Sequence, residues 1–296
     1  MKVFITGGTG LQGTYIIEQL IAEGHIVTAL ARSPASTAKA QSLGAIPVRG
    51  DHQSLDVLRE QASLADAVLH LAFNTFETLE GYVSACDEDR AAIEAMCEPL
   101  VGTSKTFIYA SGTLLTAGET EDDPKEDNDA FPRILSDRLV LSYATKGVRA
   151  IVVRCPPVVH SATHRHLFIT SQIEAAKKYG YAAYISDGQA VWPSVHAKDA
   201  ANVYVLALDP TKAPSGVSLH PVAEEAIPVK TIAEFIGQKL NVGVKSIPPE
   251  QAFEHFGFTG MVLQMTNRTT SKRTREWLGW EPKEIGLLEE LEGYEF

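Results

Sequence analysis

The chain has 296 residues, of which 45% are hydrophobic and 21% charged, a composition typical of a globular protein with a large buried core. Its formal net charge of -11 at pH 7 argues against a nucleic-acid or anionic-membrane surface, because both need clustered lysines and arginines. Three cysteines without a CxxC motif (Cys86, Cys97 and Cys155) predict reduced thiols in a cytosolic setting, and no apolar run approaches the roughly 20 residues that span a bilayer.

Short apolar segments alternate with longer amphipathic segments through the first half of the chain. The apolar segments predict the strands Lys2–Thr6, Ile26–Ala31, Ile46–Val48, Ala67–Ala72, Thr106–Ala110 and Ala150–Arg154. The amphipathic segments between them predict helices such as Leu11–Glu23, Leu55–Ser63, Val83–Leu100 and Leu135–Lys146. Strands that are apolar on both faces and separated by helices indicate a doubly wound α/β fold, in which helices cover both sides of a parallel sheet. Ligands of such folds bind beyond the carboxyl ends of the strands.

The pattern loosens after Pro156, where loops containing proline and glycine separate the predicted elements. The helices expected there are Phe168–Tyr179, Asp199–Leu208, Thr231–Leu240 and Thr270–Leu278. We expect residues 1–160 to form the main domain. Residues 161–296 are expected to form mainly a smaller substrate-binding lobe, with segments that return to the core.

A glycine-rich segment follows the first predicted strand directly and opens the first predicted helix. Its glycines permit a tight turn, a close approach of backbone to a diphosphate, and close packing of helix on strand. The helix N-terminus adds unpaired N–H groups and partial positive charge. The sequence therefore predicts a dinucleotide-binding site formed by Gly7, Thr9, Gly10, Leu11, Gln12 and Gly13. No Gly-Lys-Ser/Thr follows the glycines, which argues against a P-loop.

The end of the second predicted strand bears on the choice between NAD and NADP. An acidic residue there would bind the ribose 2′-hydroxyl and repel a 2′-phosphate, but this sequence has Arg32 and Ser33 and no acid nearby. Arg32 can donate two hydrogen bonds to a phosphate and Ser33 can add another. We therefore expect NADP(H) as the cofactor, with NADPH preferred over NADH. Asp51, after the third strand, suits a hydrogen bond to the adenine amino group.

Several segments in chain order carry a family resemblance. They are TGGTGLQG at residues 6–13, HLA at 70–72, IYAS at 108–111, VRCPPV at 153–158 and DGQAVWPSVH at 187–196. With them the chain resembles the short-chain dehydrogenase/reductase superfamily, in the extended or atypical branch that includes sugar-nucleotide epimerase/dehydratase-like proteins. The resemblance runs from Met1 to roughly Trp280 and implies a Rossmann fold. It implies an active-site serine at Ser111 and contacts with the cofactor at Ala72, Phe73, Ala110 and Pro156.

The sequence departs from that family at its catalytic Tyr-x-x-x-Lys pair. In the family the tyrosine gives a proton to the substrate oxygen, and the lysine holds the ribose and lowers the tyrosine pKa. At the corresponding distance from Ser111 this chain has Arg133 and Asp137 instead. These two side chains are four residues apart and share a helix face, so one interpretation is an ion pair that only holds the helix. The other places Arg133 over the cleft, where it polarises a carbonyl or binds an anionic group.

The missing tyrosine leaves the proton donor open. Candidates are Ser111 acting through water, His160 at the end of the sixth strand, and Tyr82. His160, His164 and His166 lie close in sequence, but no cysteine or carboxylate stands at ligand spacing from them, so we expect no metal.

Taken together, the motifs predict an NADP(H)-dependent oxidoreductase that reduces or oxidises a carbonyl or hydroxyl of a small organic molecule. Two alternatives stay open: a catalytically silent NADP(H)-binding regulatory protein or redox sensor, and a nucleotide-sugar epimerase or dehydratase. The expected partner is a small-molecule substrate, with no nucleic acid and no membrane, and the sequence leaves a homodimer open. The expected location is the cytoplasm.

Overall fold

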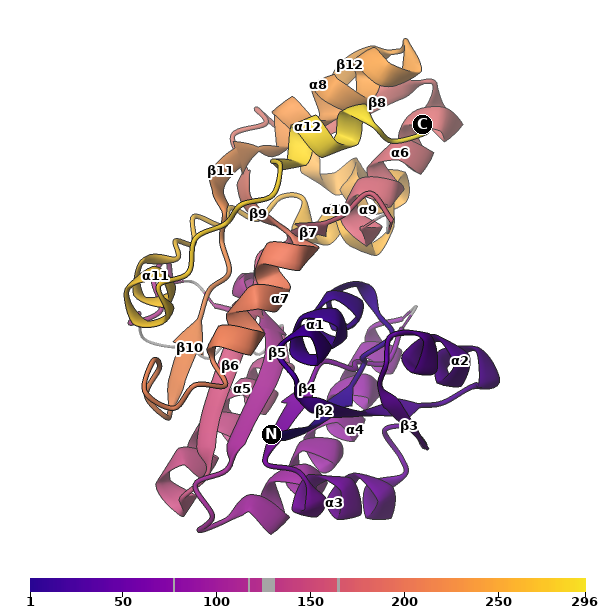
Figure 1. Ribbon diagram of the computed structural model, residues 1–296. Coiled ribbons are helices and arrows are strands. Elements are labelled where there is room, and N and C mark those ends of the chain that lie inside the picture. Colours follow the sequence, from indigo (N-terminus) through magenta and orange to yellow (C-terminus); the bar gives the residue numbers. More distant parts are fainter. Residues whose placement is uncertain (77, 117, 124–130, 164–165) are drawn as a thin grey trace.

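A seven-stranded sheet forms the centre of the main domain (Figure 1), in a computed structural model that describes residues 1–76, 78–116, 118–123, 131–163 and 166–296. All of its neighbouring strands pair in parallel, in the order β10-β6-β5-β4-β1-β2-β3. The strands are β1 (Lys2–Thr6), β2 (Ile26–Ala31), β3 (Ile46–Arg49), β4 (Ala67–His70), β5 (Thr106–Gly112), β6 (Arg149–Cys155) and β10 (Val217–Leu219). The predicted doubly wound parallel sheet is therefore confirmed. The strand order reverses between β1 and β4, the point where such folds bind ligands.

Helices cover both faces of this sheet (Figure 1). On one face α1 (Leu11–Ala22) and α7 (Ala197–Leu206) pack side by side over a core that includes Ile5, Ile16 and Tyr204. On the other face α3 (Leu55–Leu64), α4 (Leu79–Cys97) and α5 (Ile134–Ser142) enclose a second core. Because strand residues alternate between the two cores, the strands are apolar on both faces, as a buried parallel sheet requires.

The rest of the chain builds a smaller lobe beyond one end of the sheet (Figure 1). A three-stranded sheet of order β11-β9-β7 and a parallel pair of β12 with β8 lie there with their own apolar core. Its elements are β7 (Val158–His160), α6 (Leu167–Tyr179), β8 (Tyr181–Ile185), β9 (Val191–His196), β11 (Glu224–Pro228), α8 (Val229–Leu240), β12 (Gly243–Ile247), α9 (Ala252–Phe256), α10 (Phe258–Val262) and α12 (Leu287–Glu292). The segment from α7 to β10 returns to the main domain, and α11 (Lys272–Leu278) packs near α7.

Most differences from the predicted elements lie at element ends. Helix α4 begins at Leu79 instead of Val83, because the Thr78 side chain accepts a hydrogen bond from Gly81 N and caps the helix earlier. Helix α2 (Pro34–Ser42), a short polar helix with one buried residue, Ala40, was not expected from the sequence. Its N-terminus is fixed by Ser33 at the N-cap and by proline at the first helical position.

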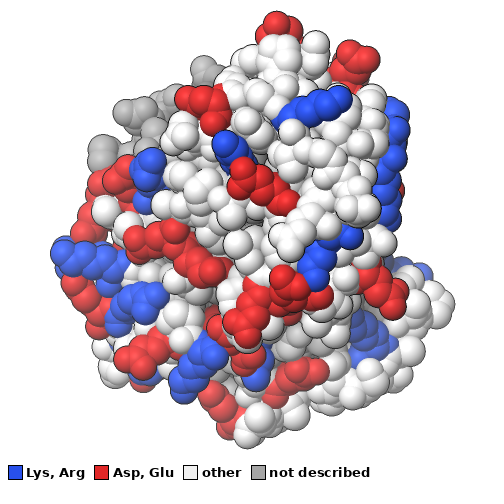
Figure 2. All heavy atoms as spheres, turned by 90° about the horizontal axis from the view of Figure 1, so that it is seen from above, with Lys and Arg blue, Asp and Glu red and all other residues white. Residues whose placement is uncertain are grey.

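Charged side chains are dispersed over the lobe. On the face seen from above, acidic and basic groups are interspersed and no continuous basic area appears (Figure 2). In the described part of the chain, no helix combines the length and the apolar character that crossing a membrane needs.

Candidate functional site

The glycine-rich turn between β1 and α1 is shaped for a close backbone approach. Gly7 has a φ of +70°, a left-handed conformation that glycine adopts without strain. A Cβ on Gly13 would lie 2.3 Å from Gly7 O, so only glycine lets α1 pack this closely on the turn. Gly10 is the N-cap of α1 and has no side chain that could satisfy the first N–H groups of the helix. These groups therefore suit a diphosphate, and the turn fits a dinucleotide.

A cavity of about 400 Å³ opens beside this turn, at the carboxyl ends of β1 to β4. Among the residues that line it are seven predicted for the cofactor: Gly7, Thr9, Gly10, Arg32, Asp51, Ala72 and Phe73. Ala72 N stands 2.7 Å from the place of a Cβ on Gly7, which shows how closely the end of β4 approaches the turn. We call this space the cofactor cavity.

The wall of the cofactor cavity beyond β2 is basic. Arg32 and Ser36 line it, and the Lys39 ammonium donates to Thr9 O at 2.9 Å. Ser33, predicted as a ligand, instead caps α2: its hydroxyl accepts from Ser36 N at 3.1 Å. Ser36 and Lys39 were missed because α2 itself was not predicted.

Asp51 is tied to the start of α3. Its Oδ1 accepts hydrogen bonds from the Ser54 hydroxyl and from the N–H groups of Gln53 and Ser54. These bonds, the Ser54 hydroxyl foremost, lower the pKa of Asp51. The residue lines the cofactor cavity as an ionised group whose Oδ1 is held by α3.

A second cavity of about 350 Å³ lies between the main sheet and the lobe. Among the residues that line it are Leu11, Gln12, Phe73, Ser111, Arg133 and Pro156, six of those predicted for cofactor or substrate. Phe73 lines both cavities, so the two spaces adjoin at this ring. We call the second space the substrate cavity. Ala110 and Gly13, also predicted for the cofactor, are not among its lining residues.

Ser111 belongs to a buried network at the floor of the substrate cavity. Its hydroxyl donates to Asp137 Oδ1 at 2.5 Å, and Arg154 Nε donates to Asp137 Oδ2 at 2.8 Å. The sheet register explains this, because Ser111 on β5 is paired with Arg154 on β6, and Asp137 on α5 reaches both. The interpretation that Arg133 and Asp137 form an ion pair is therefore wrong: the guanidinium of Arg154 is the partner of the Asp137 carboxylate.

Arg133 is held by the ends of β4 and β5 instead. Its Nε donates to the Tyr109 hydroxyl at 3.1 Å and its Nη2 to Ala110 O at 2.8 Å. Its guanidinium carbon lies 4.0 Å from the centre of the Phe73 ring, a cation–π contact. One face of the guanidinium is thus covered while the residue lines the substrate cavity. Burial alone would lower the pKa of Arg133. The charge and hydrogen bond of Tyr109 and the charge of Asp89 outweigh burial and raise this pKa, so Arg133 stays protonated.

Behind Arg133 runs a buried polar chain. The Tyr109 hydroxyl donates to Asp89 Oδ2 at 2.7 Å, and His70 Nε2 lies 3.2 Å from Asp89 Oδ1. Thr6 Oγ1 lies 2.6 Å from the other nitrogen of His70. Thr6, His70 and Tyr109 are register partners across β1, β4 and β5, so the sheet itself aligns them.

The Asp89 carboxylate at the centre of this chain is ionised. Burial alone would raise its pKa, but the hydrogen bond from His70 and the charges of His70 and Arg133 outweigh burial and hold it at about 2. Asp89 is therefore the counter-charge of Arg133, through Tyr109.

Comparison with known proteins decides the family. Residues 3–218 match the model of the NAD dependent epimerase/dehydratase family, well over half of the chain. The chain belongs to this family.

An uncharacterized protein of Schizosaccharomyces pombe, C2A9.02, is 40% identical over 294 residues, which are 98% of each chain. A Stigmatella aurantiaca protein, 4-hydroxy-2-methyl-3-oxo-4-farnesyl-3,4-dihydroquinoline-1-oxide ketoreductase, is 30% identical over 164 residues, 52% of this chain and 49% of that one. The structure of DesIV, a dTDP-glucose 4,6-dehydratase from Streptomyces venezuelae, has the same fold: TM-score 0.76 and 18% identity, over 98% of this chain and 94% of that chain.

Within this epimerase/dehydratase family, the resemblance led us to expect a tyrosine and a lysine where Arg133 and Asp137 stand. Each replacement has an opposite charge nearby that was not connected to it from the sequence: Asp137 is paired directly with Arg154, and Arg133 is linked to Asp89 through the Tyr109 hydroxyl. Asp89 does not stand out in the sequence, because it is the last of three consecutive acidic residues at positions 87–89 on α4.

The other candidate proton donors differ in placement. Tyr82 lines the substrate cavity, where burial raises its pKa. His160 does not line it: the ring is buried, its Nδ1 is bound to Glu290 of α12, and burial lowers its pKa. We therefore withdraw His160 as a candidate. His166 does line the cavity, and burial followed by the nearby His160 lowers its pKa to about 4. His164 lies outside the described residues.

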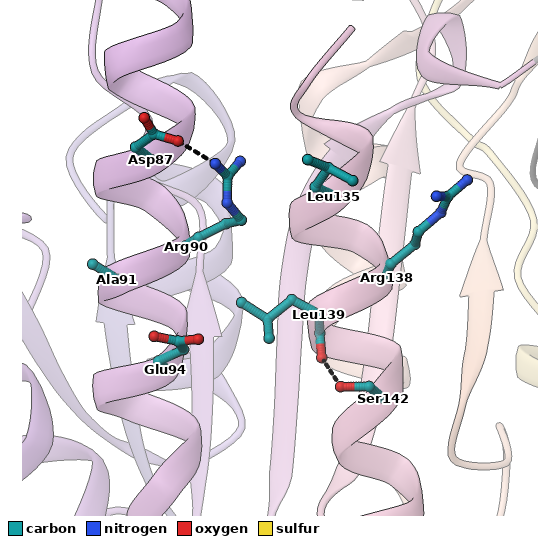
Figure 3. A pocket seen from close by; sticks show the side chains of 8 residues that line it. All are labelled: Asp87, Arg90, Ala91, Glu94, Leu135, Arg138, Leu139 and Ser142. Carbon is teal, nitrogen blue, oxygen red and sulfur yellow. Dashed lines mark hydrogen bonds and ion pairs between the residues drawn. The ribbon is translucent and has the colours of Figure 1, made fainter. Parts of the chain in front are cut away.

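Two other features have some of the properties of a site. In the described part of the chain, His52, His70 and Asp89 are grouped closely enough to hold a metal ion. Their atoms are already engaged, however, since His52 Nε2 contacts Ala72 O at 3.0 Å and His70 binds both Thr6 and Asp89. An open hollow between α4 and α5 (Figure 3) is lined by groups such as Glu94 and Leu139 and lies apart from both cavities.

Proposed function

We propose that this protein is an NADP(H)-dependent oxidoreductase that reduces or oxidises a carbonyl or hydroxyl group of a small organic molecule. The observation that carries the proposal is the meeting of the two cavities at Phe73. One is bordered by the glycine turn, and the other contains Ser111 and Arg133. A dinucleotide held at the turn can extend past Phe73 toward Ser111. The name of the Stigmatella aurantiaca relative, a ketoreductase, agrees with carbonyl chemistry.

The basic wall of the cofactor cavity supports NADP(H) over NAD(H). Arg32 and Ser36 line the cavity at the N-terminal end of α2, and Lys39 follows on the next turn of that helix. A 2′-phosphate there would meet a guanidinium, a hydroxyl and the positive end of a helix dipole. Strand β2 ends in Ala31, followed by Arg32, so no carboxylate stands at the position that binds the 2′-hydroxyl in NAD enzymes.

The cofactor supplies the hydride, and the protein orients the substrate and manages charge. Arg133 donates hydrogen bonds to the substrate oxygen and stabilises the negative charge that develops as hydride reaches the carbonyl carbon. It keeps its own protons, and the hydrogen of the Ser111 hydroxyl is donated to Asp137, so the proton that completes the alcohol comes from water. Asp137 fixes the Ser111 hydroxyl, and Asp89 neutralises Arg133, so both polar groups are oriented before the substrate binds.

The test is oxidation of NADPH by the purified protein with aldehydes, ketones and keto acids, together with calorimetric titration of NADPH. We expect turnover with some carbonyl compound and a fall in kcat of about 100-fold or more for Arg133→Ala, with NADPH affinity unchanged. Arg138→Ala, on the same helix at the hollow of Figure 3, is the matched control and should keep wild-type kcat. Tight NADPH binding without turnover across the panel would favour the regulatory or redox-sensor alternative.

A further inference from the structure

We infer that the substrate cavity binds an apolar carbonyl compound with a planar aromatic or conjugated body. This rests on the proposed function and names the class of molecule that the site takes. The lining residues include aromatic, leucine, proline and valine side chains from both the main domain and the lobe. Ligand sites of this kind combine an apolar wall with a few polar groups that fix orientation.

Aromatic rings form the wall next to the cofactor. Phe73, Phe76 and Tyr82 form one cluster, in which the Phe76 ring centre lies 4.8 Å from that of Tyr82 and 6.4 Å from that of Phe73. Phe258, on α10 of the lobe, meets Phe76 edge to face with ring centres 5.4 Å apart. The two parts of the protein therefore close the cavity with rings. A flat conjugated molecule can place its faces and edges against them at the favourable offsets of aromatic pairs.

The lobe side of the cavity continues this apolar surface. Leu167, Phe168 and Val262 line it, and Phe168 packs on the buried Trp192 with ring centres 5.3 Å apart. Thr113 is a polar member of the lining, but its hydroxyl donates to Asn267 Oδ1 at 3.0 Å. The Thr113 hydroxyl therefore already has a hydrogen-bond partner in the lobe and does not require a sugar hydroxyl as its partner.

Charge separates this class from nucleotide sugars. Among the described residues that line the cavity, Arg133 is the one arginine or lysine. Asp89 already balances its charge through Tyr109. A nucleotide diphosphate would bring two negative charges into this apolar space and would need further cationic partners there. A neutral carbonyl oxygen needs only the hydrogen bonds that the open edge of the Arg133 guanidinium can donate.

The same residues set the orientation. Phe73 covers one face of the Arg133 guanidinium at 4.0 Å, so the group presents its edge to the cavity. A carbonyl oxygen at that edge points the rest of the molecule toward the rings of Phe76, Tyr82 and Phe258. The polar end of the substrate thus lies beside Ser111 and its conjugated body lies under the lobe.

The experiment compares kcat/KM for NADPH oxidation by the wild-type protein with cinnamaldehyde and benzylideneacetone against pyruvate and oxaloacetate. Conversion of dTDP-glucose in the presence of NADP⁺ is followed in parallel by chromatography of the sugar nucleotide, because an epimerase or a dehydratase returns its hydride to the product and forms no net NADPH. We expect the conjugated compounds to exceed the keto acids by at least tenfold, and dTDP-glucose to stay unconverted. Turnover that is best with a keto acid overturns the substrate class and leaves the oxidoreductase proposal standing, whereas conversion of dTDP-glucose without net NADPH overturns both. NADPH binding without turnover of any compound overturns both.

A pair of variants tests the ring wall itself. Phe258→Ala removes one of the lobe's rings from the cavity, and Phe253→Ala on the adjacent α9, 64% exposed and not in the lining, is the control. We expect Phe258→Ala to lower kcat/KM for cinnamaldehyde by about tenfold through KM, a loss typical of one aromatic contact. Unchanged KM in Phe258→Ala with an unchanged melting temperature contradicts the inference. If that variant unfolds, Phe258→Leu replaces it, with a smaller rise in KM as the expected result.

Discussion

Replacing Asp89 by asparagine removes the charge that balances Arg133 while it keeps the shape of the side chain. Asp89 is 1% exposed and has a pKa of about 2 instead of the usual 3.8. A shift of nearly two units corresponds to about 2 kcal/mol in the free energy of unfolding, at about 1.4 kcal/mol per unit. Because the pKa is lower in the folded state, this contribution is complete above the unfolded pKa and is lost as pH falls through the folded pKa.

Urea unfolding of the wild-type protein and of Asp89→Asn at pH 7, pH 5 and pH 3 measures the contribution of the Asp89 charge to the free energy of unfolding. The difference in the free energy of unfolding should be about 2 kcal/mol at the two higher pH values and about half of that at pH 3. Asp87→Asn is the control on the same helix, because its exposed ion pair with Arg90 should contribute well under 1 kcal/mol. A difference of equal size at pH 7 and pH 3, or an equal loss in Asp87→Asn, would refute the assignment of Asp89 as a buried counter-charge.

Two further variants test the cavities separately. Arg32→Glu should weaken NADPH binding by about 10- to 100-fold and leave NADH binding nearly unchanged, because only NADPH carries the 2′-phosphate. Calorimetric titration with both nucleotides measures the two affinities, and Arg59→Glu is the surface control. Equal weakening of both nucleotides would show that Arg32 does not bind the 2′-phosphate. Ser111→Ala should lower kcat by about 100-fold with NADPH affinity unchanged, measured by steady-state kinetics and titration, and an unaltered rate would remove Ser111 from the active site.

The fold could be predicted largely from sequence because its signals are local. The glycine turn, the alternation of apolar strands with helices, and the strand-end residues such as Arg32 all lie within short segments. The second lobe was harder, since its short strands β7, β8 and β12 lack a strong period and pair with distant segments.

The candidate site could be predicted only in part. Ser111 and Arg133 were found from their spacing, but their partners come from other elements. Arg133 and Asp89 are 44 positions apart in sequence, and they meet only because α4 and the start of α5 both pack against Tyr109 of β5. Asp137 was assigned to Arg133 by helix spacing, whereas a strand arginine, Arg154, binds it. His160 was expected at the end of the sixth strand but lies in β7, a short strand that was not predicted, and Glu290 from the last helix, 130 positions away, engages its ring.

The path of the chain between its two parts limits how the protein can be divided. Strand β10 completes the main sheet from beyond α7, and the backbone N–H groups of Lys283 and Glu284 bind the Asp199 carboxylate on α7. Neither part is a contiguous segment. A fragment of residues 1–160 would therefore lack β10, which pairs with β6, and α7, which packs on α1. The lobe of this chain therefore cannot be excised or replaced as one contiguous segment. New specificity is more readily obtained by changing individual rings and loops around a retained cofactor cavity.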